Sequence, residues 1–146
     1  MTKKVLIVED EIFVALEIEQ IVQDAGFTVS AIAMDRDAAL AAAVEGCDIA
    51  LVDLNLRDGP TGPAVGIDLA TRFGVRVIYV TANPAQIGTA SVAAIGVITK
   101  PFRAHSISAA LQLAASDAPR LDAADIIGFT PFLPPVGSWS GAESRG

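Results

Sequence analysis

Val5-Leu-Ile-Val-Glu-Asp-Glu11 is the stretch that decides the fold, because four apolar residues lead directly into three carboxylates. Short, near-continuous apolar runs recur at residues 29–33, 49–52, 75–80 and 97–99. Runs of this length without polar alternation are typical of strands covered on both faces of a parallel sheet. The sequence therefore predicts five buried strands.

Helical segments are predicted after each of these strands. Residues 12–25 carry an apolar stripe at helical spacing and end at Gly26. Further helices are expected at residues 35–45, 64–73, 84–94 and 103–116, with Asp35 as a cap and Pro84 in a first turn. This alternation predicts an α/β fold with a doubly wound five-stranded parallel sheet and helices on both faces. In such a sheet, ligands bind at the carboxyl ends of the strands.

Size and charge narrow the classes of function. The chain has 146 residues and a formal net charge of −7, so we expect one domain with little attraction to nucleic acid. It has no uninterrupted apolar run near the ~20 residues of a membrane helix, and we expect a soluble, cytoplasmic protein without membrane contact. A single cysteine, Cys47, excludes an internal disulfide.

The composition changes after Ser116. We expect residues 1–118 to form the domain and residues 119–146 to form an irregular C-terminal tail without a separate output domain. Prolines at 131, 134 and 135 forbid a long helix in the tail. Its middle is too apolar for an ordinary solvated linker, so we expect residues 121–136 to pack on a surface.

The polar residues at the predicted strand ends define a candidate site. They are Glu9, Asp10, Asp53, Thr81 and Lys100. Gathered carboxylates repel one another unless a cation offsets their charge, and an all-oxygen, partly hydrated ligand set suits Mg²⁺. With the metal and Lys100 offsetting charge, a phosphoryl group could approach Asp53 while the Thr81 hydroxyl donates to one of its oxygens. The pattern indicates phosphoryl transfer to a carboxylate.

These residues lie in recognisable segments. Val5–Glu11, Leu51-Val-Asp-Leu-Asn-Leu-Arg-Asp-Gly59, the pair Thr81-Ala82 and Lys100-Pro101-Phe102 together resemble the receiver domains of bacterial two-component response regulators. The resemblance covers roughly residues 3–116 in the family's order and spacing. It implies the flavodoxin-like strand order 2-1-3-4-5.

The resemblance also implies roles for the site residues. Asp53 is the phosphoacceptor, Glu9 and Asp10 form the acidic pair, and the Mg²⁺ ligands are Asp10, Asp53 and the Asn55 backbone carbonyl. Thr81 and Lys100 contact the phosphoryl group, and the Lys100–Pro101 bond is expected to be cis. The implied donor is a phosphohistidine on a sensor histidine kinase or a histidine phosphotransfer protein. Such a protein catalyses its own phosphorylation and autodephosphorylation and has no external substrate.

Four positions depart from the family or vary within it. Val97 stands where the family usually has a Tyr or Phe that swings inward on activation, so the usual route of signal transmission is in doubt. Glu9 stands where Asp is more usual, and an outer metal ligand can act through water. Asn55 and Asn83 occupy positions that tune the lifetime of the phosphoryl group in the family.

Three other functions compete with this interpretation. A haloacid-dehalogenase-type hydrolase needs an acid two residues after its nucleophile, and Asn55 cannot transfer that proton. A nucleotide- or flavin-binding protein needs a glycine- or hydroxyl-rich loop after the first strand, where this chain has carboxylates. The third is a degenerate receiver that binds proteins without being phosphorylated.

The output is expected to run through protein–protein contacts, in a relay, as a phosphate sink or on a downstream target. Ala90, Ala94 and Val97 predict an apolar surface, which motivates the hypothesis that the tail covers a face used for target binding or homodimer formation.

Overall fold

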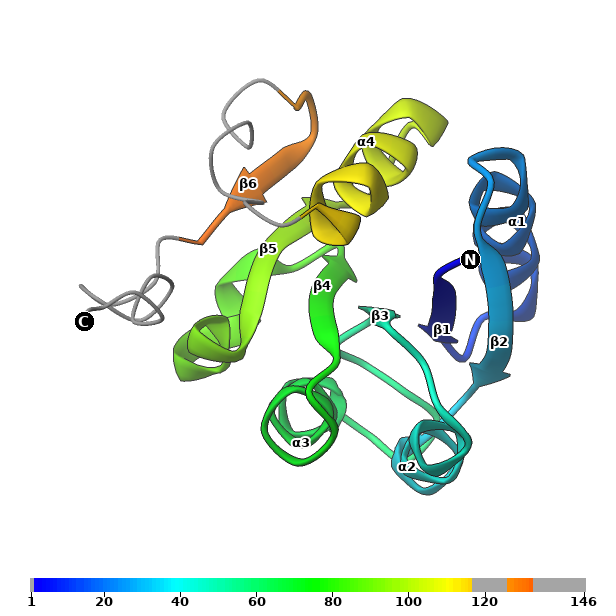
Figure 1. The fold of residues 1–146 in the computed structure, drawn as a ribbon. Helices are drawn as coiled ribbons and strands as arrows, with labels where there is room; N and C mark the ends of the chain where they lie inside the picture. Colours follow the sequence, from blue (N-terminus) through cyan, green and yellow to red (C-terminus); the bar gives the residue numbers. More distant parts are fainter. Residues whose placement is uncertain (1, 117–125, 133–146) are drawn as a thin grey trace, which may run out of the picture.

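The computed structural model describes residues 2–116 and 126–132 (Figure 1). The strands are β1 (Lys4–Val8), β2 (Thr28–Ala33), β3 (Ile49–Val52), β4 (Arg76–Thr81), β5 (Ala94–Thr99) and β6 (Phe129–Pro131). The helices are α1 (Ile12–Asp24), α2 (Arg36–Glu45), α3 (Gly62–Phe73), the 3₁₀ segment η1 (Pro84–Ala93) and α4 (Ala104–Ala115). Strands β1 to β5 pair in parallel in the order 2-1-3-4-5, which confirms the predicted fold.

The sheet is covered on both faces, as its apolar strands require. On one face α1 and α4 bury Ile18, Val22 and Ile107 against β1, β3 and β5. On the other face α2, α3 and η1 build a second core around Leu6 and Tyr79. All four residues of β3 are buried. The buried strands thus form a rigid layer. This layer fixes the backbone positions of the residues just beyond the strand ends.

The predicted helix ends are set by local chemistry. The Asp35 side chain accepts a hydrogen bond from the Ala38 N–H at 2.9 Å, and the helix then runs to Gly46. Helix α3 ends at Gly74, whose φ of 67° places it in the left-handed region that favours glycine. These two helices agree with the sequence pattern to within one or two residues at each end.

The segment between β4 and β5 departs from the prediction. It forms two short 3₁₀ stretches separated by a kink at Gly88 (φ 56°, ψ −134°), instead of one helix over residues 84–94. A left-handed glycine interrupts helical geometry, so Ala94 falls into β5, which begins three residues earlier than expected. Ala90, Ala94 and Val97 are buried. The apolar surface that they were expected to form is therefore absent, because their side chains belong to the second core.

Part of the tail is ordered on the sheet. Residues 126–132 include β6, which pairs antiparallel with β5 and extends the sheet to the order 2-1-3-4-5-6. In Figure 1, β6 (orange) lies along the outer side of β5. These residues fall within 121–136, the part of the tail expected to pack on a surface, and the remainder of 119–146 lies outside the described residues. Among the helices described, none is long and apolar enough to span a membrane.

Candidate functional site

The strand ends place the site residues through backbone hydrogen bonds that continue past the strands. The Glu9 N–H donates to the Ala33 carbonyl and the Asp53 N–H to the Val8 carbonyl, both at 2.9 Å. The Lys100 N–H donates to the Thr81 carbonyl at 2.9 Å. These hydrogen bonds hold the main chains of Glu9, Asp53 and Lys100 in place, and their side chains extend beyond the carboxyl ends of the strands.

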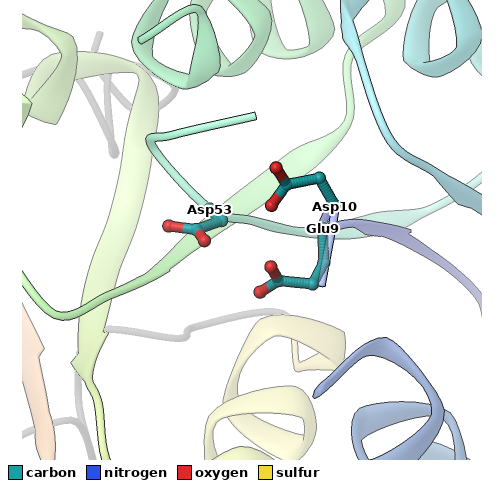
Figure 2. A group of neighbouring side chains, drawn as sticks. All are labelled: Glu9, Asp10 and Asp53. Atoms are coloured by element: carbon teal, nitrogen blue, oxygen red, sulfur yellow. The ribbon is translucent and has the colours of Figure 1, made fainter. Parts of the chain in front are cut away.

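Three carboxylates meet at the ends of β1 and β3. Glu9, Asp10 and Asp53 each offer an oxygen, and these oxygens lie within 4.8 Å of one another. Figure 2 shows the three side chains close together, with Asp10 and Glu9 on opposite sides of the ribbon that carries them and Asp53 next to them. Glu9 is 1% exposed and Asp53 is 8% exposed. Charges this close and this buried repel strongly unless a cation offsets them.

Lys100 supplies part of that positive charge. Its Nζ donates to Glu9 Oε1 at 2.8 Å and to Asp53 Oδ2 at 3.0 Å. Burial alone lowers the pKa of the Lys100 ammonium, but its hydrogen bonds to Glu9 and Asp53 outweigh that effect, so the pKa is raised. Lys100 therefore remains protonated in the site.

The two buried carboxylates have further partners. Glu9 Oε2 accepts from the Glu11 N–H at 3.1 Å, and Asp53 Oδ1 accepts from the Leu54 N–H at 2.7 Å. Burial, together with the smaller effect of the Asp53 charge, raises the pKa of the Glu9 carboxyl against the opposing effects of Lys100 and the Glu11 N–H. The site thus retains an electrostatic cost that a second cation would relieve.

The donor set fits a hard divalent cation. Carboxylate oxygens of Asp10 and Asp53, with Glu9 beside them, are the ligand type that Mg²⁺ prefers, and Asp10 is only partly buried, which leaves room for retained waters. Two carboxylates and several waters are a common Mg²⁺ arrangement in phosphoryl-transfer sites. The residues present therefore fit the metal that the sequence predicts.

Thr81 is the last residue of β4, and Pro101 follows Lys100 just beyond the end of β5. Thr81 is 1% exposed, and its Oγ1 accepts from the Asn83 N–H at 3.1 Å. That hydroxyl hydrogen is free to be donated elsewhere. The Lys100–Pro101 bond is cis, as expected. Ala82 and Asn83 are exposed at the start of the following loop.

Gln86 pairs with Asn55 beside the site, and no pattern in the sequence marks it. Gln86 Nε2 donates to Asn55 Oδ1 at 2.8 Å, and Asn55 Nδ2 donates to Gln86 Oε1 at 3.2 Å. This reciprocal amide pair links η1 to the loop after Asp53. Glutamine on a loop-like segment is common, and only the three-dimensional pairing distinguishes this one.

Val97 lies away from the acidic group, in the second core. Its partner across the sheet is Tyr79 of β4, which is fully buried and donates from its hydroxyl to the Ala90 carbonyl at 3.2 Å. Burial raises the pKa of Tyr79 to about 12. Position 97 of β5 has no aromatic side chain, but its neighbour on β4, Tyr79, has one. The Tyr79 hydroxyl connects β4 to η1 through its hydrogen bond with Ala90.

Comparisons with known proteins agree with this geometry. The family model for the response regulator receiver domain matches residues 5–112. The phyllosphere-induced regulator PhyR of Methylorubrum extorquens is 33% identical over 117 residues, which are 78% of this chain and 44% of that protein. The chain therefore spans less than half of the length of this curated relative.

Solved structures show the same likeness. The receiver domain of Erythrobacter litoralis PhyR has a TM-score of 0.71 at 30% identity, over 77% of this chain and 89% of that one. The anti-anti-sigma factor PhyR of Bartonella quintana has a TM-score of 0.60 at 30% identity, over 71% of this chain and 43% of that one. With the matching family model covering most of the chain, this protein belongs to the response regulator receiver domain family.

Proposed function

We propose that this receiver accepts a phosphoryl group on Asp53 from a phosphohistidine of a sensor kinase or phosphotransfer protein, with Mg²⁺ bound, and then acts through protein–protein contacts. One observation carries the proposal: the ends of β1, β3 and β5 bring Asp53, two further carboxylates and the Lys100 ammonium together. Lys100 bridges two buried carboxylates, Glu9 and Asp53.

The chemistry follows from these positions. An Asp53 carboxylate oxygen attacks phosphorus, the P–N bond of the phosphohistidine breaks, and the imidazole leaves with the bonding electron pair. Lys100, already 3.0 Å from Asp53 Oδ2, offsets the charge that gathers on the phosphoryl oxygens. The Thr81 hydroxyl donates to one of those oxygens. When bound, Mg²⁺ supplies further positive charge beside them. Hydrolysis of the resulting acyl phosphate ends the signal.

Intact-protein mass spectrometry after incubation with acetyl phosphate tests the proposal. We expect one phosphoryl adduct that requires Mg²⁺ and is released by hydroxylamine, as acyl phosphates are. If no adduct forms, binding of beryllofluoride with Mg²⁺ reports whether the site recognises the phosphoryl geometry. Failure of both would replace this proposal with the phosphorylation-independent binding module.

Metal binding makes a separate prediction about stability. Mg²⁺ that binds only the folded chain raises its unfolding free energy, by about 1.4 kcal/mol at a concentration ten times Kd, or about 4 °C in Tm. Asp10→Asn removes one ligand oxygen and one charge, so we expect the Mg²⁺-induced shift to disappear. Differential scanning fluorimetry with and without Mg²⁺ measures it. Asp37→Asn, an exposed carboxylate on α2, should keep the full shift. An unchanged shift in Asp10→Asn would place the metal elsewhere.

The first turns of α1 offer a docking surface for the donor protein. Phe13 is 84% exposed, and Ile12 and Leu16 are more than 40% exposed. Helix α1 starts directly after the acidic residues, so these apolar side chains lie near the site. Exposed apolar groups beside a reactive site mark a protein-binding surface. We expect Phe13→Ala to slow phosphoryl transfer from a phosphohistidine-carrying donor protein about tenfold or more.

The small-molecule donor provides the control for this prediction. Phosphorylation of Phe13→Ala by acetyl phosphate should proceed at the parent rate, because Phe13 is 84% exposed and is not part of the acidic group. Val44→Ala, 72% exposed at the end of α2, should leave both reactions unchanged. Equal slowing of both donors in Phe13→Ala would mean that the substitution damages the site itself.

A further inference from the structure

The outer edge of β5 is occupied by a segment of the same chain. Residues 126–132 run antiparallel to β5, with Ile98 opposite Phe129 and Val97 opposite Thr130. The Phe132 N–H donates to the Ile95 carbonyl at 2.9 Å, and the Thr99 N–H donates to the Gly128 carbonyl at 3.3 Å. The polar groups along this edge of the sheet are thus satisfied by a short strand.

A notch at Gly96 receives the ring of Phe129. A Cβ atom at Gly96 would lie 2.4 Å from the Phe129 ring and 2.6 Å from the Thr130 carbonyl oxygen. The ring therefore fits only because residue 96 has no side chain. Phe129 is 6% exposed and packs with the core that α4 covers. The segment is thus anchored by a side chain in a shaped site, in addition to its backbone pairing.

A buried hydroxyl provides a second anchor. Ser106 on α4 is 1% exposed, and its Oγ donates to the Ile127 carbonyl at 2.5 Å. Gly128 follows at a φ of +82°, where a side chain would also collide with that hydroxyl. Without residues 126–132, a buried hydroxyl and a row of backbone groups would lose their partners.

This covering segment lies outside the receiver module, because the family model ends at residue 112. The edge of β5 is therefore an edge of the module itself. An uncovered strand edge is a template for another strand, and proteins use such edges to bind extended peptides. Backbone pairing gives affinity in this mode, and a side-chain pocket gives specificity.

We propose that the β5 edge with its Gly96 notch is a docking site for an extended segment of a partner protein, and that residues 126–132 mask this site in cis. The segment that fits places an aromatic ring over Gly96 and runs antiparallel to β5, as Phe129 and its neighbours do. A helix cannot supply the backbone pairing. The proposal does not depend on phosphorylation, so it can fail while the proposed function holds.

A peptide competition in the full-length chain tests it. The probe is a labelled synthetic peptide of residues 125–132, and its binding is measured by fluorescence anisotropy. In Phe129→Ala the cis strand loses its anchor, whereas Ile127→Ala, 64% exposed in the same segment, is the matched control. Amide hydrogen exchange at Thr99, whose N–H pairs with Gly128, reports independently whether the edge has opened.

We expect Phe129→Ala to expose the Thr99 amide and to bind the probe at least about tenfold more tightly than the parent or Ile127→Ala. A probe carrying the same alanine substitution should not bind, and adding Gly96→Val to the chain should abolish binding by filling the notch. If Phe129→Ala does not fold, Thr130→Pro replaces it as the variant that opens the β5 edge. This substitution removes a backbone donor of β6 at an exposed position.

Two results would overturn the proposal. The first is fast hydrogen exchange at the Thr99 amide of Phe129→Ala without binding of the labelled peptide. The edge of β5 would then be open but unable to accept a strand. The second is a concentration-dependent dimer of the parent in sedimentation that Gly96→Val abolishes, because residues 126–132 would then be seated on a second copy.

Discussion

Asp53→Asn is expected to abolish the acetyl phosphate adduct completely, leaving no labelled protein at any Mg²⁺ concentration. The carboxylate is the nucleophile in the proposed reaction, and an amide oxygen does not form a stable acyl phosphate. The substitution keeps the shape of the side chain and an oxygen that can accept from the Leu54 N–H, which now donates to Asp53 Oδ1 at 2.7 Å. The loss would therefore report chemistry and not misfolding. Intact mass and hydroxylamine release measure it.

Asp58→Asn is the matched control, because Asp58 lies in the same loop with no part in the acidic group. Its carboxylate accepts from Thr61 Oγ1 at 2.6 Å and from the Arg36 N–H at 3.2 Å, and the Thr61 hydrogen bond is the main cause of its lowered pKa. The control should be labelled at the parent rate. A hydroxylamine-labile adduct persisting in Asp53→Asn would move the acceptor to another carboxylate, with Glu9 and Asp10 the nearest.

The parallel core could be predicted because its signals are local. Each of the five parallel strands contains a short, near-continuous apolar run. The ends of α2 and α3 are marked by residues that cap helices, which are Asp35, Gly46 and Gly74. The kink at Gly88 could not be predicted, because glycine permits a left-handed φ without requiring it. Strand β6 has three residues and contains Pro131, so it has no period of its own; its existence depends on the edge of β5 and the Gly96 notch.

The acidic group could be predicted from topology alone, since parallel strands end on one edge and carry Glu9, Asp53 and Lys100 to it. The pairing of Lys100 with two carboxylates needed coordinates. The Gln86–Asn55 amide pair joins residues 31 positions apart through exposed side chains, and no sequence period marks such a contact. The roles assigned to these residues remain predictions that the variants test.

Lys100→Met is expected to destabilise the chain and to abolish labelling by acetyl phosphate. Methionine keeps an unbranched side chain of similar length but removes the ammonium, so Glu9 and Asp53, with side chains 2% and 11% exposed, face each other unpaired. Removing one partner from a buried ion pair costs about 3–5 kcal/mol. We expect the free energy of unfolding to fall by about 3 kcal/mol at neutral pH, at the low end of that range because the Lys100 side chain is 17% exposed. Chemical denaturation with and without Mg²⁺ measures the loss.

The pH dependence of this loss identifies its cause. Glu9 already has a pKa raised above its ordinary value of 4.5, and without Lys100 that pKa should rise further. A carboxyl whose folded pKa is raised favours folding below its unfolded pKa and loses that contribution as pH rises through the folded pKa. The penalty of Lys100→Met should therefore shrink as pH falls toward 4.5, and Mg²⁺ should reduce it at neutral pH. Lys3→Met, an exposed lysine, should change neither stability nor labelling. A penalty independent of both pH and Mg²⁺ would show that Lys100 stabilises the fold by packing and not by its charge.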